Sequence, residues 1–379
     1  MSGLVKIDGS LGEGGGQVLR IALSLSALYK IPIEIENIRA GRPKPGLAAQ
    51  HLKGVEIAQS MCNAQVKGGY PGSTRLEFIP GVISKTQKRT FHADTQTAGC
   101  ICLLAQVALP IALFLPPGEP ITLVLKGGTN VPMGPHIEYF TEVFRPWLNK
   151  LGADFDFTVL KRGYYPKGGG EVHLRIPPVK SLNSVEMLHQ GEIKSISGWA
   201  YVAGSVHLSE AYNMAEVTKN TIHRKLTDNN IPVPSINIES YREDREMAVG
   251  NGSGINVVCQ LNSGSVIGGS GLGSNRRDNK SDPAVEAAEQ IVKPILDGSC
   301  IDEHMQDQMV LLMALAHGRS RLLLGKQQLT QHTETAIKVA ELMLGNRGFR
   351  CQVTANQNAG DSKQNILECD GCGLTNAVN

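Results

Sequence analysis

The sequence predicts an α/β (α+β) fold of three similar modules, with a smaller fourth α/β unit inserted before the third. Three segments share one order of elements, namely an apolar helix, a strand, a glycine-containing loop and an amphipathic helix. The spacing of the loop glycines Gly127 and Gly325 is more than twice the spacing of Gly41 and Gly127. The longer interval therefore indicates an insertion.

The first module contains every element of this order. A strand carrying VKIDG precedes a glycine turn and an apolar helix over 17–28, and a second strand follows over 31–38. The loop AGRPKPG then leads into a helix over 47–61 and two short strands that end near Ile79.

The second module is predicted from a helix over 100–107, a strand over 121–125, the loop KGGTNVPMGP and a helix over 140–151. The last helix has apolar residues at i, i+3, i+4, i+7, i+8 and i+11, which form one face. The longest apolar stretch, Ile101–Leu115, predicts a buried helix followed by a strand. It is shorter than the roughly 20 residues that a membrane-spanning helix needs, so no membrane association is expected.

The third module is predicted from a helix over 308–316, a strand over 321–324, the loop GKQQLTQ, a helix with apolar residues at 336, 339, 340, 343 and 344, and strands over 350–354 and 365–368. The insertion is assigned to 185–280, because its own helix and strand signals end in a Gly/Ser/Asn-rich stretch over 264–279. The large domain then comprises 1–184 and 281–379.

The charge balance limits the classes of partner. The chain has 37 Lys and Arg against 35 Asp and Glu, so it lacks the overall positive field of a protein that coats nucleic acid, and any phosphate site must be local. Aromatic residues make up only 5%, which argues against a base-stacking platform. Eight irregularly spaced cysteines and the lack of a signal-peptide pattern predict an intracellular, reduced protein.

A glycine cluster, GEGGGQVLR, opens the first apolar helix. Its backbone N–H groups can approach a phosphate, while Glu13 and Arg20 supply a carboxylate and a guanidinium at the same helix end. The cluster matches neither the P-loop nor the dinucleotide-binding pattern. A glycine turn that merely begins a helix is the alternative.

A second cluster, RAGRPKPGLAAQH, places Arg39 and Arg42 on a proline-stiffened loop, with Gln50 and His51 in the helix that follows. Two such arginines can form a rigid fork for one phosphate. The alternative is a solvated basic loop. Stiffness favours the phosphate fork, since a merely solvated loop gains nothing from prolines.

The third cluster, GKQQLTQHTETA, places His332 in the first turn of a helix if Thr330 is its N-cap. The positive end of the helix dipole favours a neutral imidazole and attracts phosphate, so His332 is a candidate nucleophile; a polar neighbour of the cap is the alternative. Lys6, in a K-x-D-G pattern, is a competing nucleophile. Cys369 and Cys372 form a single C-x-x-C without a second ligand pair, so structural zinc is not expected.

Taken together, GEGGGQVLR, RAGRPKPGLAAQHL, KGGTN, RGYYPKGGGEV and DEHMQDQ followed by QHTETA closely resemble the RNA 3′-terminal phosphate cyclase family, over essentially the whole chain. RGYYPKGGGEV and the long C-terminal tail are most similar to animal members. The resemblance implies three repeats of a βαβαββ-type unit plus an inserted domain. It also implies ATP-dependent conversion of an RNA 3′-phosphate end into a 2′,3′-cyclic phosphodiester.

The resemblance further implies a role for each matching residue. His332 would be the nucleophile that carries AMP, and Glu13 would face the Mg²⁺ or Mn²⁺ ion that bridges the ATP phosphates. The RNA terminal phosphate would be held by Arg20, Arg39, Arg42, Gln50 and His51, and ATP by Gln106, Pro135, His304, Asp307 and Gln308. His304 stands where relatives commonly have tyrosine, which offers a larger ring for stacking on adenine. Animal members imply a nuclear location, with the cytosol as the alternative.

Three other classes remain as alternatives. A ribosome-assembly or RNA-binding scaffold would keep the basic loops but would need neither His332 nor ATP, and the cyclase-like scaffold lacks both this histidine and the glycine cluster. A lysine-dependent ligase would depend on Lys6. An enolpyruvyl-type transferase shares the fold but does not need a histidine at the start of the third module's helix.

Overall fold

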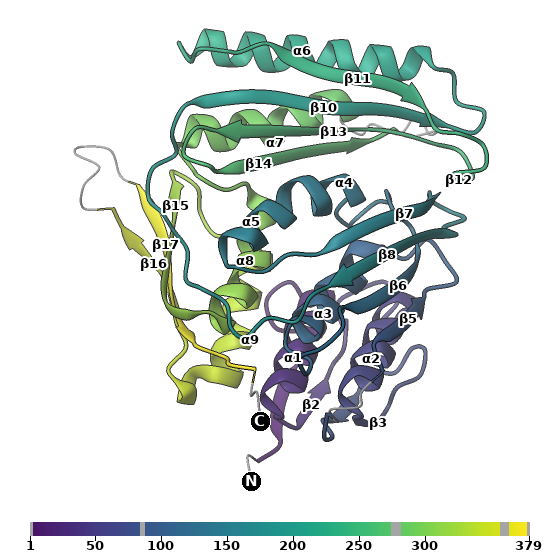
Figure 1. Cartoon of the computed structure of the whole chain (residues 1–379), viewed down its shortest axis with the longest axis vertical. Coiled ribbons are helices and arrows are strands. Elements are labelled where there is room, and N and C mark those ends of the chain that lie inside the picture. Colours follow the sequence, from purple (N-terminus) through teal and green to yellow (C-terminus); the bar gives the residue numbers. More distant parts are fainter. Residues whose placement is uncertain (1–2, 84–87, 274–281, 357–363, 377–379) are drawn as a thin grey trace.

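The computed structural model describes residues 3–83, 88–273, 282–356 and 364–376, and has a mixed α/β fold with four mixed sheets (Figure 1). Three sheets lie in the lower part of Figure 1, around a group of helices, and the fourth lies above them with its own two helices. The mixed α/β class predicted from the sequence is confirmed.

The first sheet has the strand order β1-β2-β4-β3, in which β1 is parallel to β2 and the other pairs are antiparallel. Its elements are β1 (Val5–Asp8), α1 (Gly16–Tyr29), β2 (Ile33–Glu36), α2 (Ala49–Cys62), β3 (Gln65–Lys67) and β4 (Leu76–Ile79). Both helices end at a residue in the left-handed region, Lys30 and Asn63, whose backbone N–H groups close the last turn.

The second sheet has the equivalent order β5-β6-β8-β7, with a short strand from the insertion, β12, on its edge. Its elements are β5 (Thr90–Asp94), α3 (Ile101–Leu113), β6 (Ile121–Gly127), α4 (Ile137–Tyr139), the π-helical turn η1 (Phe140–Phe144), α5 (Arg145–Lys150), β7 (Asp156–Gly163), β8 (Gly170–Ile176) and β12 (Ala248–Val249). The apolar run Ile101–Leu115 does not change from helix to strand as predicted, because α3 continues through Pro110.

The third sheet has the order β9-β15-β17-β16, again with one parallel pair at the edge. Its elements are β9 (Glu186–Met187), α8 (Glu303–Leu315), β15 (His317–Gly325), α9 (Gln331–Leu344), η2 (Gly345–Arg347), β16 (Arg350–Ala355) and β17 (Asn365–Cys372). The predicted start of α8 at Gln308 is too late. Asp302 is the N-cap and accepts hydrogen bonds from the backbones of His304 and Met305, so the helix begins a turn earlier.

The insertion forms a separate sheet with the order β11-β10-β13-β14. Its elements are β10 (Ile193–Ala203), α6 (Ser209–Asp228), β11 (Ile236–Arg242), β13 (Gly252–Leu261), β14 (Val266–Leu272) and α7 (Pro283–Asp297). Both helices contribute to the buried cluster of this sheet. Since α7 packs here, we propose that the inserted unit extends to Asp297, whereas residues 274–281, with the predicted boundary at 280, lie outside the described residues.

The Gly/Ser/Asn-rich stretch over 264–279, in which the predicted insertion ends, begins with a strand, β14. Its glycines serve close packing rather than chain reversal. A Cβ added at Gly269 would lie 2.3 Å from the carbonyl oxygen of Ala287, and one at Gly271 would lie 2.1 Å from that of Pro283. Without side chains at these positions, α7 approaches the strand closely.

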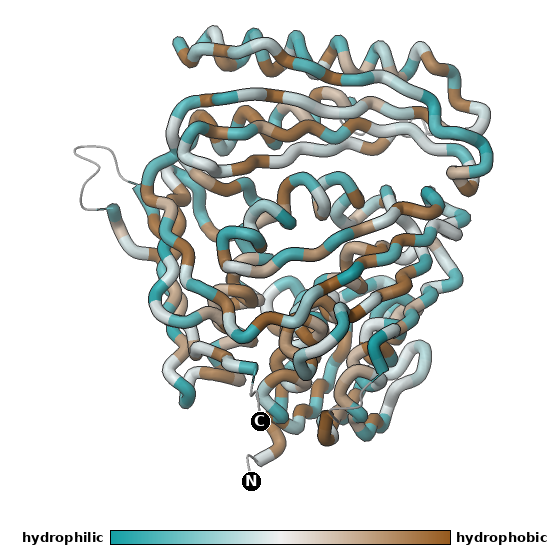
Figure 2. Tube along the Cα trace, in the orientation of Figure 1, coloured by the Kyte–Doolittle hydropathy of each residue, from teal (hydrophilic) through white to brown (hydrophobic). Residues whose placement is uncertain are grey.

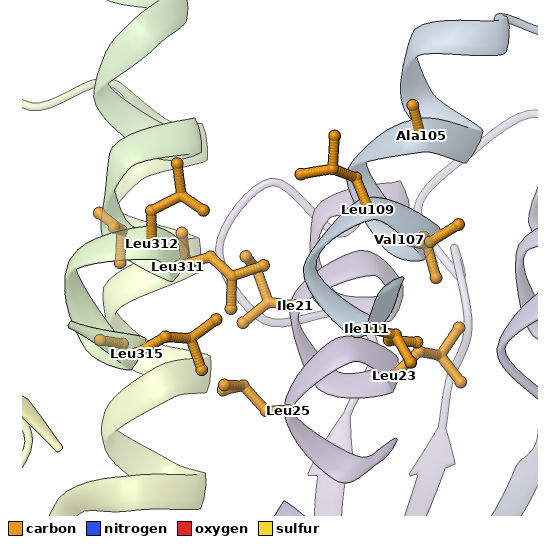
Figure 3. Packing of buried hydrophobic residues seen from close by; sticks show 14 of the residues in the cluster. Ile21, Leu23, Leu25, Ala105, Val107, Leu109, Ile111, Leu311, Leu312 and Leu315 are labelled. Atoms are coloured by element: carbon orange, nitrogen blue, oxygen red, sulfur yellow. The ribbon is translucent and has the colours of Figure 1, made fainter. Parts of the chain in front are cut away.

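The largest core lies where α1, α3 and α8 pack together (Figure 3). Ile21 of α1 faces Leu311 of α8, and Leu23 lies beside Ile111 of α3. The tube coloured by hydropathy shows apolar residues along these inner helices (Figure 2). All six apolar positions predicted along 140–151 are buried, although η1 interrupts the regular α-helix there.

The cysteines depart from the prediction of a fully reduced chain. Cys351 and Cys369 are a directly opposed pair on β16 and β17 and form a disulfide, so this prediction is wrong for the pair. Cys372 is a free thiol, and the structure therefore does not pair it with Cys369. Within the described residues, no helix is both long and apolar enough to cross a membrane.

Candidate active site

The glycine turn before α1 packs against α9, which brings the first and third modules together. Gly12 has φ +62°, and a Cβ added there would lie 2.0 Å from Thr335 Oγ1. The backbone N–H of Glu13 donates to the same oxygen at 3.2 Å. The contact therefore requires glycine, and it positions Glu13 beside the first turn of α9. Thr335 is a site residue that was not predicted, although it lies three residues after His332 and so on the same side of a helix.

His332 lies in the first turn of α9, as predicted. Thr330 is the N-cap, and its hydroxyl accepts a hydrogen bond from the backbone of Thr333 at 3.1 Å. The imidazole is half-exposed, and its Nδ1 lies 3.4 Å from Glu13 Oε1.

The charge environment of His332 differs from the one expected at a helix start. The hydrogen bond with Glu13 raises the pKa of His332 above its ordinary value, against the opposing effect of burial, and the charges of Glu13 and Asp307 add to the increase. The helix dipole alone favours a neutral ring, but the nearby carboxylate outweighs it. No local pattern indicates this pairing, because Glu13 and His332 are far apart in the chain.

Glu13 connects the histidine with the predicted phosphate fork. Its Oε2 lies 2.9 Å from Arg42 Nη2, while Oε1 faces His332. Burial raises the pKa of Glu13, but the hydrogen bond and charge of His332 outweigh this effect and leave the pKa below its ordinary value. Glu13 is therefore a carboxylate at neutral pH.

Three arginines surround His51. A Cβ added at Gly16 would lie 2.6 Å from His51 Nε2 and 2.8 Å from Arg20 Nη1, so both side chains lie against the glycine turn. Burial, followed by the positive charges of Arg39 and Arg20, lowers the pKa of His51 to about 3. The ring is therefore neutral at physiological pH, and the three arginines around it favour the binding of an anion.

The structure also assigns internal partners to two of the predicted RNA-binding residues. Arg39 has φ +52°, and its Nη1 donates to the carbonyl oxygen of Gly46 at 2.8 Å, within its own loop. Gln50 Oε1 accepts a hydrogen bond at 2.6 Å from the backbone N–H of Cys100, at the start of α3. Gln50 thus links α2 to α3.

Three of the predicted ATP-binding residues lie together. Gln106, Asp307 and Gln308 line a cavity of about 30 Å³ with Arg20. Burial raises the pKa of Asp307, against the charges of Arg20 and His332, which connects this group electrostatically to the candidate nucleophile. The cavity has about the volume of one water molecule and is far below the roughly 300 Å³ typical of small-molecule sites, so it does not itself accommodate a nucleotide.

The other two predicted ATP-binding residues do not line this cavity. The carbonyl oxygen of Pro135 accepts a hydrogen bond from the Cys100 thiol at 3.4 Å. The exposed His304 lies edge-on to the Tyr139 ring, with 6.2 Å between ring centroids. The structure therefore brings Gln106, Asp307 and Gln308 together but places His304 and Pro135 outside their cavity.

Glu13 is the residue predicted to hold a divalent ion. Both of its oxygens already have partners, and the described ranges contain no group of three or more acidic, histidine or cysteine side chains arranged to hold a metal. A single carboxylate is enough for Mg²⁺ when nucleotide phosphates and water supply the other ligands. The residues thus fit an ion that arrives with ATP, and not one held by the protein alone.

Several polar atoms in this cluster are buried without a hydrogen-bond partner: Arg20 Nε, His51 Nδ1 and Gln308 Oε1. Unpaired buried polar atoms are rare in folded proteins and indicate a place for water or a polar ligand. The competing nucleophile Lys6 is different, because its mostly exposed ammonium lies 3.7 Å from Glu34 on the neighbouring strand.

Comparisons with known proteins show which family the chain resembles. The family model described as RNA 3′-terminal phosphate cyclase matches residues 11–348. The chain is 39% identical to the RNA 3′-terminal phosphate cyclase of Drosophila melanogaster, over 99% of this chain and 98% of that protein. It is 37% identical to the protein of that name from Pyrobaculum aerophilum, over 97% and 99%. It is also 33% identical to a probable RNA 3′-terminal phosphate cyclase of Dictyostelium discoideum, over 97% and 82%.

Proposed function

We propose a mechanism for this chain, which belongs to the RNA 3′-terminal phosphate cyclase family and is an enzyme of that kind. It converts the 3′-phosphate end of an RNA into a 2′,3′-cyclic phosphodiester, and we infer that ATP drives the reaction through an AMP carried on His332. The observation that supports this most directly is the position of Glu13 between His332 Nδ1 and Arg42.

Glu13 prepares His332 for the first step. When Nδ1–H donates to the Glu13 carboxylate, the lone pair of the neutral ring is on Nε2, the nitrogen free to react. Nε2 forms a bond to the α-phosphorus of ATP as the bond to pyrophosphate breaks. A phosphoramidate with AMP results, and Glu13 stabilises the positive charge that the ring gains.

The arginine cluster serves the second and third steps. A phosphate of the RNA end, held by Arg20, Arg39 and Arg42, attacks the phosphorus of the adduct and releases His332. The adjacent 2′-OH then attacks the activated phosphate, loses its proton and expels AMP. Because both reacting groups belong to one nucleotide, proximity contributes about 7 to 11 kcal/mol, and no dedicated base is required. His51 and Gln50 complete this proposed site by holding the loop and helix around it.

The nucleotide would be bound near Gln106, Pro135, His304, Asp307 and Gln308, and its Mg²⁺ or Mn²⁺ ion would be held by Glu13. The ion would neutralise phosphate charge. Arg20 bonds Gln17 and lies near Asp307, so it is held between the proposed RNA and ATP residues. For location we propose the nucleus, on the similarity to animal members; a fluorescent fusion confined to the cytosol would contradict it.

The decisive experiment is incubation with labelled ATP in the absence of RNA, followed by acid or alkali. A phosphoramidate on histidine is lost in acid and survives alkali. His332→Ala should remove the labelled adduct and cyclisation, and Lys6→Ala should retain both, since Lys6 lies against Glu34 rather than in the cluster. AMP found on Lys6 by mass spectrometry, or cyclisation without any adduct, would contradict the mechanism.

The same assay separates the scaffold alternative, because a ribosome-assembly module would form no adduct. The three sheets with equivalent strand order support the modular interpretation of the fold but do not discriminate between these activities. The proposed function therefore depends on His332, Glu13 and the arginines rather than on the architecture.

A further inference from the structure

A second cleft, of about 400 Å³, lies between the second module and the insertion. One wall is formed by residues of α4, η1 and β7, and the other by residues of β10 and β11. Its volume is within the range of small-molecule sites. It is lined by none of the residues assigned above to RNA, ATP or metal, so it is a separate feature of the molecule.

The walls of the cleft combine aromatic rings with carboxylates. Phe157, Trp199 and Tyr241 contribute rings that are partly exposed, from both sides of the cleft. Charge is contributed by Glu138, Glu142, Glu239 and Arg162, and the remaining lining residues are Ile137, Val159 and Thr141.

The single cation of the lining is already neutralised. Arg162 Nη1 donates to Glu138 Oε1, and its Nε lies 3.0 Å from Glu243 Oε1. Glu138 Oε2 also accepts from Asn130 at 2.7 Å and from Asn256 at 3.2 Å. This network connects β7 and α4 with the insertion, and among the described residues it leaves no free positive charge in the lining.

Two carboxylates of the lining remain without a cation. Within the described residues, neither Glu142 nor Glu239 has a basic group within 4.0 Å. Arg145 is bound to Asp154 at 2.6 Å and lies 3.5 Å from Asp156; its hydrogen bond to Asp154 is the largest cause that raises its pKa, and the charge of Glu142 adds to the increase. The lining is therefore negative overall, which disfavours RNA and ATP as occupants.

Aromatic faces beside uncompensated carboxylates are the chemistry that recognises organic cations. The ring faces attract a cation and cover its hydrocarbon part, while the carboxylates bind its N–H groups. The π-helical turn η1 contributes Thr141 and Glu142 to the wall, and such turns are frequent at functional sites. We propose that this cleft binds a small organic cation, an alkylammonium or guanidinium ion.

The test is a titration of the full chain, without RNA or ATP, with spermidine and with agmatine, followed by calorimetry and tryptophan fluorescence. The chain has two tryptophans; Trp147 is fully buried, so Trp199 should report binding. Wild type should bind at least one of the two cations, more weakly at high salt. Trp199→Phe should remove the fluorescence change.

Glutamate-to-glutamine substitutions remove charge and keep the shape of the side chain, so they give a quantitative test of binding affinity. Glu142→Gln and Glu239→Gln should each weaken binding about fivefold, the upper range for an exposed ion pair, and together about 25-fold. Glu119→Gln, at an exposed carboxylate in the loop before β6, is the matched control and should bind as wild type does. Unchanged thermal denaturation would show that the variants fold.

Four results would overturn the proposal. The first is that neither spermidine nor agmatine binds, and the second is that the double variant binds them as tightly as wild type does. The third is that uncharged 1,8-octanediol binds as tightly as the cations, and the fourth is that a basic peptide binds while neither small cation does. Since the proposal does not depend on His332, these results do not bear on whether His332 forms the AMP adduct.

Discussion

Gly12→Ala tests the contact that places Glu13 beside His332. The left-handed backbone at Gly12 costs an alanine about 1 to 2 kcal/mol. The new Cβ would also lie 2.0 Å from Thr335 Oγ1 and 3.0 Å from Thr335 Cβ, so rotation of the hydroxyl alone does not relieve the overlap. Overpacking of this kind costs about 1 to 3 kcal/mol. The free energy of unfolding should therefore fall by about 2 to 5 kcal/mol.

The same substitution should slow formation of the AMP adduct. If α9 moves by about 1 Å from the glycine turn, the rate should fall about 100-fold, because His332 loses its alignment with Glu13. Stability is measured by urea denaturation and adduct formation with labelled ATP. Thr335→Ala in the same chain should restore part of the stability, since it removes the closest atom.

Gly345→Ala is the matched control at the other end of α9. Its φ is −57° and an added Cβ would meet nothing within 4 Å, so its effect should lie within about 1 kcal/mol of zero. If Gly12→Ala proved as stable and as active as Gly345→Ala, the contact between the glycine turn and α9 would not be what positions Glu13.

Three further predictions concern the chemistry. Glu13→Gln should lower the pKa of His332, and because the neutral ring is the nucleophile, adduct formation should then begin to rise at a lower pH. An unchanged pH profile between about pH 5.5 and 8, the range in which histidine titrates, would refute the assigned pairing. The Arg39→Ala variant should form the adduct normally but transfer AMP to RNA about 10- to 100-fold more slowly, from a loss of about 1.5 to 3 kcal/mol. The Arg42→Ala variant should be slower in both steps, since Arg42 also binds Glu13, and single-turnover assays of each step separate the two cases. His304→Ala should raise the ATP concentration needed for half-maximal adduct formation, and His304→Tyr should not; equal requirements in all three proteins would place His304 outside the nucleotide site.

The cysteines and the glycine-rich strand show where local sequence misleads. The stretch that begins at Gly264 has the composition of a linker, yet β14 starts at Val266 because Gly269 and Gly271 allow α7 to pack closely. Cys351 and Cys369 form a disulfide because β16 and β17 place them opposite each other, a register that cysteine spacing does not reveal. In both cases the partner lies on another element.

The sequence by itself determined the alternation of helices and strands, the N-cap of α9 at Thr330 and the family to which the motifs belong. These features depend on periodicity, capping and residue type, which are local. Only the tertiary structure decided that Glu13 faces His332 and reverses the effect of the helix dipole, that Gln50 links α2 to α3, and that Gln106, Asp307 and Gln308 share one small cavity. Distance, burial and opposing charge set these properties, and all three arise from residues that are remote in the chain.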